Sequence, residues 1–188
     1  MSSEAAVPRR ADAVRNRERV VAAAAAVFAE HGIEASVPDV AARAGVGKAT
    51  VYRSFPTKEH LIAAVILTRV DEYERRAREL AGAPDAWEGL RTLITEKAAE
   101  QCVDRSLVGA LNAGIAADLM ADARVRAWQP VAELMERAKD QGRMRADATV
   151  EELRTLWIGT ARMLTADGVD DPATWRRYAG LVLDALRA

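Results

Sequence analysis

The run VVAAAAAVF at residues 20–28 is the feature that most restricts what this chain can fold into. Alanine is the best helix former, and five alanines stand here in a row. Strand-like alternation of apolar and polar residues is absent along the sequence, and only six prolines occur in 188 residues. The sequence therefore predicts an all-α protein.

Capping signals divide the chain into a series of about nine helices. We expect residues 1–11 to form a flexible arm, because they are small, polar and basic and include Pro8. Glycines and Ser/Thr/Asp capping residues then mark the helix ends. The expected helices cover about 12–31, 36–44, 47–55, 58–80, 85–101, 104–121 (one or two looser helices) and 122–141 (bent at Pro130), with two more beginning at Thr149 and Asp171.

The stretch AARAGVGKATVYRSFPTK at residues 41–58 breaks one short helix sharply and begins another. Gly45 ends the first helix, Val46 supplies an apolar plug, and Val51 and Phe55 form the inner stripe of the second. This pattern is typical of a helix-turn-helix, whose second helix enters the DNA major groove by its amino-terminal end. The candidate DNA contacts are Gly47, Lys48, Ala49, Thr50, Tyr52, Arg53 and Lys58.

Two other readings of this stretch have less support. A phosphate-cradling nucleotide loop would follow a strand, and no strand precedes Gly45. The basic residues also fit an ordinary solvated face, although the motif around them favours contact with a polyanion.

The charges are unevenly distributed along the chain. Residues 1–70 hold ten lysines and arginines against seven acids, a net charge of +3, so the remainder carries −4 of the total of −1. A basic amino-terminal part on an acidic body favours a polyanion partner for the first part only. The single cysteine, Cys102, fits a reducing compartment. No apolar run approaches a membrane span, and the first residues lack a signal-peptide core, so we expect a cytoplasmic protein without membrane contact.

The segment IEASVPDVAARAGVGKATVYRSFPTKEHLI at residues 33–62 resembles the DNA-binding domain of the TetR family of bacterial transcriptional regulators. Spacing and residue types agree over nearly fifty residues, about 15–62. Two departures are visible: Gly47 stands where the family usually has a serine that caps the recognition helix, and Ala49 where it often has glycine. The carboxy-terminal stretch DPATWRRYAGLVLDAL also resembles the last helix of some actinobacterial members.

The resemblance implies a helix-turn-helix domain at residues 12–58, joined by a long helix to a ligand-binding and dimerisation domain at 59–188. It implies a homodimer formed by the last two helices, bound to a palindromic double-stranded DNA operator as a repressor and released by an unknown small-molecule effector, with no cofactor. Large apolar side chains on these helices agree with such an interface. They are Leu156, Trp157, Leu164, Trp175, Val182 and Leu186.

The effector pocket is expected between helices of the second domain. The candidate ligand-binding residues are Trp87, Cys102, Asn112, Met120, Trp128, Trp157, Thr160 and Met163. Each of them also fits ordinary core or the dimer interface, and Asn112 stands out because a buried amide requires hydrogen-bond partners. Mild acidity and several tryptophans favour an apolar, aromatic or cationic effector.

Two rival classes are an all-α enzyme and a helical protein-interaction module that does not bind DNA. His31 and His60 lie at expected helix ends, without a cysteine or acidic cluster at metal-ligand spacing. Cys102 lies in an apolar stripe, where a thiol is inert. The sequence therefore predicts neither catalytic residues nor a metal site, and the interaction module is distinguished by the absence of salt-dependent DNA binding.

Overall fold

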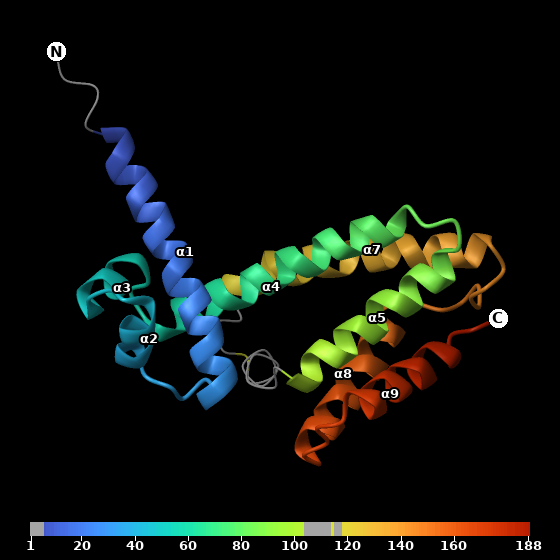
Figure 1. The fold of residues 1–188 in the computed structure, drawn as a ribbon. Coiled ribbons are helices and arrows are strands. Elements are labelled where there is room, and N and C mark those ends of the chain that lie inside the picture. The colour runs from blue at the N-terminus through green and yellow to red at the C-terminus, as the bar shows by residue number, and fades with distance from the viewer. Residues whose placement is uncertain (1–5, 104–113, 115–117) are drawn as a thin grey trace.

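A computed structural model describes residues 6–103, 114 and 118–188 of the chain (Figure 1). Within these residues it contains eight α-helices, one 3-10 turn and no strand, so the all-α prediction is confirmed. The elements are α1 (Ala6–His31), α2 (Val37–Ala44), α3 (Lys48–Ser54), α4 (Lys58–Ala81), α5 (Ala86–Val103), η1 (Asp118–Met120), α7 (Ala121–Asp140), α8 (Val150–Ala166) and α9 (Pro172–Asp184). Most of the segment 104–121, where looser helices were expected, lies outside the described residues.

Helix α1 begins earlier than the sequence indicated. It starts at Ala6 instead of residue 12, so the boundary of the predicted arm at residues 1–11 is corrected. The first backbone N–H groups of a helix have no partner within it, so Pro8 in the first turn removes no hydrogen bond. The proline that suggested an arm is therefore compatible with helix.

The predicted capping signals hold at most helix ends. Ser36 with Asp39 and Thr149 with Glu152 each form a complete capping box, in which side chain and backbone exchange hydrogen bonds. Asp171 accepts hydrogen bonds from two backbone N–H groups at the start of α9. Helix α7 continues through Pro130, which lies inside it. Local side-chain chemistry thus decides where most of these helices begin.

The described side chains form two separate hydrophobic cores. The first lies among α1, α2, α3 and the first half of α4, with Phe28, Val40 and Val51 almost completely buried. The second lies among α5, α7, α8, α9 and the last part of α4, and includes Trp87 and Trp175. Figure 1 shows the two groups of helices at opposite ends of the molecule, with α4 extending from one to the other.

Helix α4 belongs to both cores. Residues 61–66 are buried in the first, whereas Ala77 is buried in the second. Glu74 of α4 is buried and ion-paired with Arg78, and its other oxygen lies 3.4 Å from Arg126 of α7. Because both cores hold it, α4 links the two domains directly.

The second domain is organised around α5, which packs against both α7 and α9. Helices α8 and α9 are held together by Trp157 and Trp175, whose rings meet edge to face with centroids 6.4 Å apart. The indole nitrogen of Trp175 donates to the carbonyl of Val169, 3.0 Å away, so this buried tryptophan has its partner inside the fold.

Candidate DNA-binding and ligand-binding sites

The turn between α2 and α3 has the geometry that the sequence predicts for a helix-turn-helix. Gly45 adopts a left-handed conformation with φ of 64°, and its N–H reaches back to carbonyls of α2. The next N–H, of Val46, donates to the carbonyl of Ala41 at 3.0 Å. The side chain of Val46 packs against the first core. A left-handed residue followed by an apolar contact is a common way to end a helix and redirect the chain.

Helix α1 reinforces this turn from the other side. The guanidinium of Arg19 donates to the carbonyl of Ala44 at 2.7 Å. The guanidinium of Arg43 binds Glu30 with two hydrogen bonds, of 2.6 and 2.8 Å, and lowers the pKa of this carboxyl. These contacts fix α2 relative to α1, so the orientation of α3 does not depend on the turn alone.

Helix α3 has a buried stripe and an exposed side. Val51 is 1% exposed and Phe55 2% exposed, both in the first core. Arg17 of α1 lies over the Phe55 ring, 4.9 Å from its centroid. Tyr52 is 40% exposed, on the outer side, and Lys48 lies over its ring at 5.6 Å. The inward stripe thus orients the opposite face of α3 toward solvent.

Three cationic side chains lie on the exposed side of α3 and at the start of α4. Lys48 and Arg53 are exposed and Lys58 is half-buried at the first residue of α4. None of the three forms an ion pair with the residues that the structure describes. Gly47 and Ala49 are exposed and small, and Thr50 is half-buried. The seven candidate DNA contacts lie at the start of α3, along it and at the first residue of α4, and none of them is buried.

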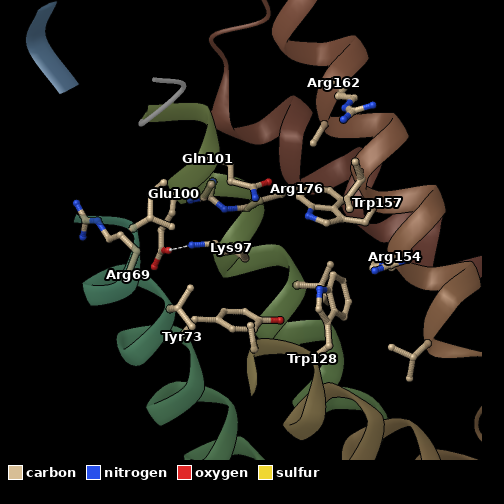
Figure 2. Close-up of a pocket in the computed structure, with 18 of the residues that line it drawn as sticks. Arg69, Tyr73, Lys97, Glu100, Gln101, Trp128, Arg154, Trp157, Arg162 and Arg176 are labelled. Carbon is tan, nitrogen blue, oxygen red and sulfur yellow. Dashed lines mark hydrogen bonds and ion pairs between the residues drawn. The ribbon is translucent and has the colours of Figure 1, made fainter. Parts of the chain in front are cut away.

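The second domain contains a cavity of about 850 Å³, bordered by α4, α5, α7, α8 and α9 (Figure 2). This volume falls within the range of pockets that hold drug-sized molecules. Its walls are largely apolar and aromatic, and include Ile66, Val70, Tyr73, Ile94, Trp128, Trp157 and Ile158. Charged side chains also line it: Arg69, Lys97, Glu100, Glu151, Arg154, Arg162 and Arg176.

Several of these charged groups already have partners. Lys97 lies 3.3 Å from Glu100 and 5.7 Å from the centroid of the Tyr73 ring. Burial raises the pKa of the Tyr73 hydroxyl, and the nearby charge of Glu100 raises it further. The hydroxyl therefore keeps its proton throughout the neutral range. In Figure 2 the tyrosine ring extends from α4 toward Trp128 of α7.

Comparison with known proteins identifies the chain. The family profile for bacterial regulatory proteins of the tetR family matches residues 20–65. The profile for the SbtR-like transcriptional regulator carboxy-terminal domain matches residues 85–188, more than half of the chain. The chain belongs to the TetR family. It is a DNA-binding transcriptional regulator and not an enzyme.

Solved structures of TetR regulators cover nearly the whole chain. The TetR transcription regulatory protein from Mycobacterium vanbaalenii is 32% identical, over 96% of this chain and 100% of that one, with a TM-score of 0.66. The TetR transcriptional regulator SCO0520 from Streptomyces coelicolor is 31% identical, over 91% and 98%, with a TM-score of 0.65. FadR from Bacillus subtilis, in complex with stearoyl-CoA, is 17% identical over 89% and 95%, with a TM-score of 0.71, and shows the shared fold alone. No curated protein sequence matches the chain.

The predicted ligand residues of this TetR regulator do not all reach the cavity. Trp128 and Trp157 line it. Trp87 and Cys102 are buried in the second core, Met163 is 61% exposed on α8, and none of the three is among the lining residues. Thr160 is half-buried and is not among the lining residues. Asn112 and the side chain of Met120 lie outside the described part of the structure.

Most of the predicted dimer residues are not at the surface of the single chain. Trp157, Leu164, Trp175, Val182 and Leu186 are buried in the chain's own core, whereas Leu156 remains 42% exposed. Other large apolar residues of α8 and α9 face solvent in their place: Met163, Tyr178 and Leu181. The spacing of apolar residues in the sequence predicted apolar stripes on α8 and α9. It did not distinguish the stripe that faces the core from the one that faces solvent.

The positive charge of the cavity could not be recognised from the sequence. The cationic side chains of the cavity come from four helices, and their spacing forms no motif. The described residues contain no group of three or more His, Cys, Asp or Glu side chains that could hold a metal ion. Among the helices that the structure describes, none combines the length and apolar character of a bilayer span.

Proposed function

We propose that this TetR regulator is a homodimer that binds a near-palindromic operator and is released from it by a small-molecule effector. The observation that carries the DNA-binding part is the exposed side of α3 with the start of α4, where Lys48, Arg53 and Lys58 form no ion pair with a described residue. Two copies of α3 would enter successive major grooves, about 34–36 Å apart or a multiple of this distance.

The candidate contacts divide into two roles. Lys48, the first residue of α3, is placed to reach a base edge, and a guanine is the preferred partner of lysine in the major groove. Arg53 and Lys58 contact phosphates, together with the hydroxyls of Thr50 and Tyr52. The small residues Gly47 and Ala49 let the backbone of α3 approach the groove closely.

The dimer interface is formed by the outward faces of α8 and α9. Leu156 and Met163 lie two turns apart on α8, and Tyr178 and Leu181 lie one turn apart on α9. Their exposed fractions range from 42% to 61%. Between the two α8 residues lies Gly159, where a Cβ would meet nothing within 4 Å, so a second helix can approach closely.

Helix α4 couples the effector cavity to the DNA-binding domain. Residues 61–66 of α4 are packed into the first core, and residues of its next two turns line the cavity. An effector that favours one position of α4 changes the separation of the two reading helices in the dimer. The operator then fits one of the two states better, so effector and DNA compete through a population shift.

The direct test is selection of bound fragments from genomic DNA with the purified full-length chain. We expect enrichment of an inverted repeat, with affinity that falls by about a thousandfold or more when salt rises from about 50 to about 200 mM. Enrichment of a single half-site would contradict the dimeric reading. An absence of duplex binding at low ionic strength would remove the proposal.

A further inference from the structure

The lining of the cavity is unbalanced in charge. Five lysine and arginine side chains reach it, against two glutamates: Arg69, Lys97, Arg154, Arg162 and Arg176 against Glu100 and Glu151. The chain as a whole carries a net charge of −1 and its second part is acidic. The excess of positive charge is therefore a property of the cavity lining and not of the domain around it. It faces a space with largely apolar walls, where solvent screens charge less than on an open surface.

Three of the five cationic side chains form ion pairs with carboxylates of the chain itself. Glu151 pairs with Arg154 on α8, and Glu100 pairs with Lys97 on α5. Arg69 lies 3.1 Å from Glu72. Both glutamates of the lining are therefore already engaged.

Arg162 of α8 and Arg176 of α9 are the remaining cations. Neither forms an ion pair with a described residue. The charge of Arg176 contributes to the lowered pKa of Asp171, but the hydrogen bonds from Thr174 and Ala173 contribute more. In Figure 2 Arg176 and Gln101 of α5 extend toward each other across the cavity.

The uncharged polar groups of the cavity point to the same chemistry. The indole N–H groups of Trp128 and Trp157 make no hydrogen bond within the described residues, although Trp157 is only 4% exposed. An indole nitrogen can only donate, and the Tyr73 hydroxyl keeps its proton. The buried oxygen of the Gln101 amide, an acceptor, lacks a partner within this part of the chain. Among the uncharged side chains of the lining, the two indoles and the Tyr73 hydroxyl can donate a hydrogen bond, and the Gln101 oxygen is an unpartnered acceptor.

We propose that the effector is an organic anion: a carboxylate or phosphate bound by Arg176, which extends into the cavity, on an apolar body that lies against the aromatic walls. Arg162 adds a second unpaired positive charge to the same lining, apart from Arg176 (Figure 2). Guanidinium groups bind both anions with paired hydrogen bonds, which makes arginine the better residue for such a site. This inference rests on the proposed role of the cavity as the effector site. It reverses the expectation of a cationic effector, which followed from the charge of the whole chain and not of the cavity.

Isothermal titration calorimetry of the full-length chain, without DNA, tests the ligand class. The probes are matched sets on two bodies, a flat naphthyl and a flexible decyl, each as the carboxylate, the phosphate, the alcohol and the amine. We expect the better of the two anions to bind at least about tenfold more tightly than the alcohol on the same body, and the amine to bind most weakly. The ratio of the carboxylate and phosphate affinities then shows which acid the cavity prefers.

Exposed-residue variants keep the test independent of folding. Arg176→Gln should reduce binding of the anion by about tenfold and leave the alcohol unchanged. Arg162→Gln, which removes a charge of the same lining farther from Arg176, should reduce it less. Arg177→Gln is the matched control, because Arg177 is exposed on α9 beside Arg176 but does not line the cavity. Equal binding of anion and alcohol, stronger binding of the amine, or no anion binding at millimolar concentration would overturn the inference. Anion binding that leaves DNA affinity unchanged would support it and contradict the proposed release mechanism.

Discussion

The guanidinium of Arg19 in α1 donates a hydrogen bond to the backbone carbonyl of Ala44, the last residue of α2, at 2.7 Å. The last carbonyls of a helix have no partner within it, so this contact supplies one at the point where the chain turns toward α3. The same guanidinium lies 3.3 Å from where a Cβ on Gly45 would stand. The turn of the DNA-binding motif is therefore held jointly by a glycine and by a side chain from another helix.

Loss of the Arg19 contact should weaken the first domain. We expect Arg19→Ala to lower the free energy of unfolding by about 1 kcal/mol, because the carbonyl of Ala44 loses its donor in a partly buried site. Urea denaturation followed by circular dichroism measures the change. Arg15→Ala, which removes only an exposed pair with Asp12, is the control and should cost less than about 0.5 kcal/mol. Equal losses in the two variants would contradict a special role for Arg19.

Helix α3 begins without a side-chain cap, and this can be improved. Gly47 has φ of −71° and ψ of 146°, a conformation open to any residue, and a Cβ there would meet nothing within 4 Å. Gly47→Ser should therefore raise stability by about 0.5–1 kcal/mol, through a new cap and a less flexible unfolded chain. Thermal denaturation measures the gain. Gly47→Ala gains only through the unfolded chain, so a serine variant no more stable than the alanine variant would show that no cap forms.

Lys48 and Lys58 should differ in how they affect DNA recognition. Lys48→Ala is expected to cost about 1–3 kcal/mol at one base pair and to relax the preference there, whereas Lys58→Ala weakens all sequences alike. Fluorescence anisotropy with the selected operator and its single-base variants separates the two effects. If Lys48→Ala keeps the same base preference, Lys48 does not contact a base edge.

The outward faces of α8 and α9 should control the oligomeric state. Leu181→Glu places a charge on a residue that is 53% exposed in the single chain, so the fold tolerates it while the proposed interface does not. Sedimentation velocity should show a shift from twice the chain mass of 20.4 kDa to the monomer. Val14→Glu, on an exposed position of α1, is the control and should remain dimeric. A dimer in both variants would place the interface elsewhere.

The link between α4 and α5 should give stability a dependence on pH. Arg76 donates to both oxygens of Glu96, at 2.9 and 2.8 Å, and these hydrogen bonds hold the pKa of this carboxyl below its usual range. A folded-state pKa below the unfolded value of about 4.3 means that the pair stabilises the protein above that pH. The contribution is lost as pH falls through the lower folded value.

Denaturation of the parent and Glu96→Gln proteins across the acid range tests this. The parent should be more stable above about pH 5, and the difference should shrink progressively toward about pH 3. A difference that persists undiminished in acid would assign the effect of the substitution to packing and not to charge.

The helices and the DNA-binding motif could be predicted because their signals are local. Ser36 and Asp39 stand three residues apart, and Gly45 marks its own turn, so neighbours in sequence determine the structure. The start of α1 was missed because Pro8, which can end a helix, is equally acceptable within a first turn. Such a residue does not distinguish an arm from a helix.

The cavity and the dimer face could not be predicted in the same way. Arg162 and Arg176 line the same cavity only because α8 packs on α9, and nothing in their spacing indicates it. On α8, Trp157 and Leu156 are adjacent in sequence, yet one is buried and the other exposed. A helix with two apolar stripes has two possible inner faces, and tertiary packing alone selects between them.

Because α4 is anchored in both cores, it also acts as a lever. Its 24 residues span about 36 Å, so a tilt of about 5° at the cavity end displaces the other end by about 3 Å. A displacement of that size is comparable to the length of a hydrogen bond to a base edge. In the dimer that we propose, an effector contact that tilts α4 by this amount would move both recognition helices out of register with the double helix.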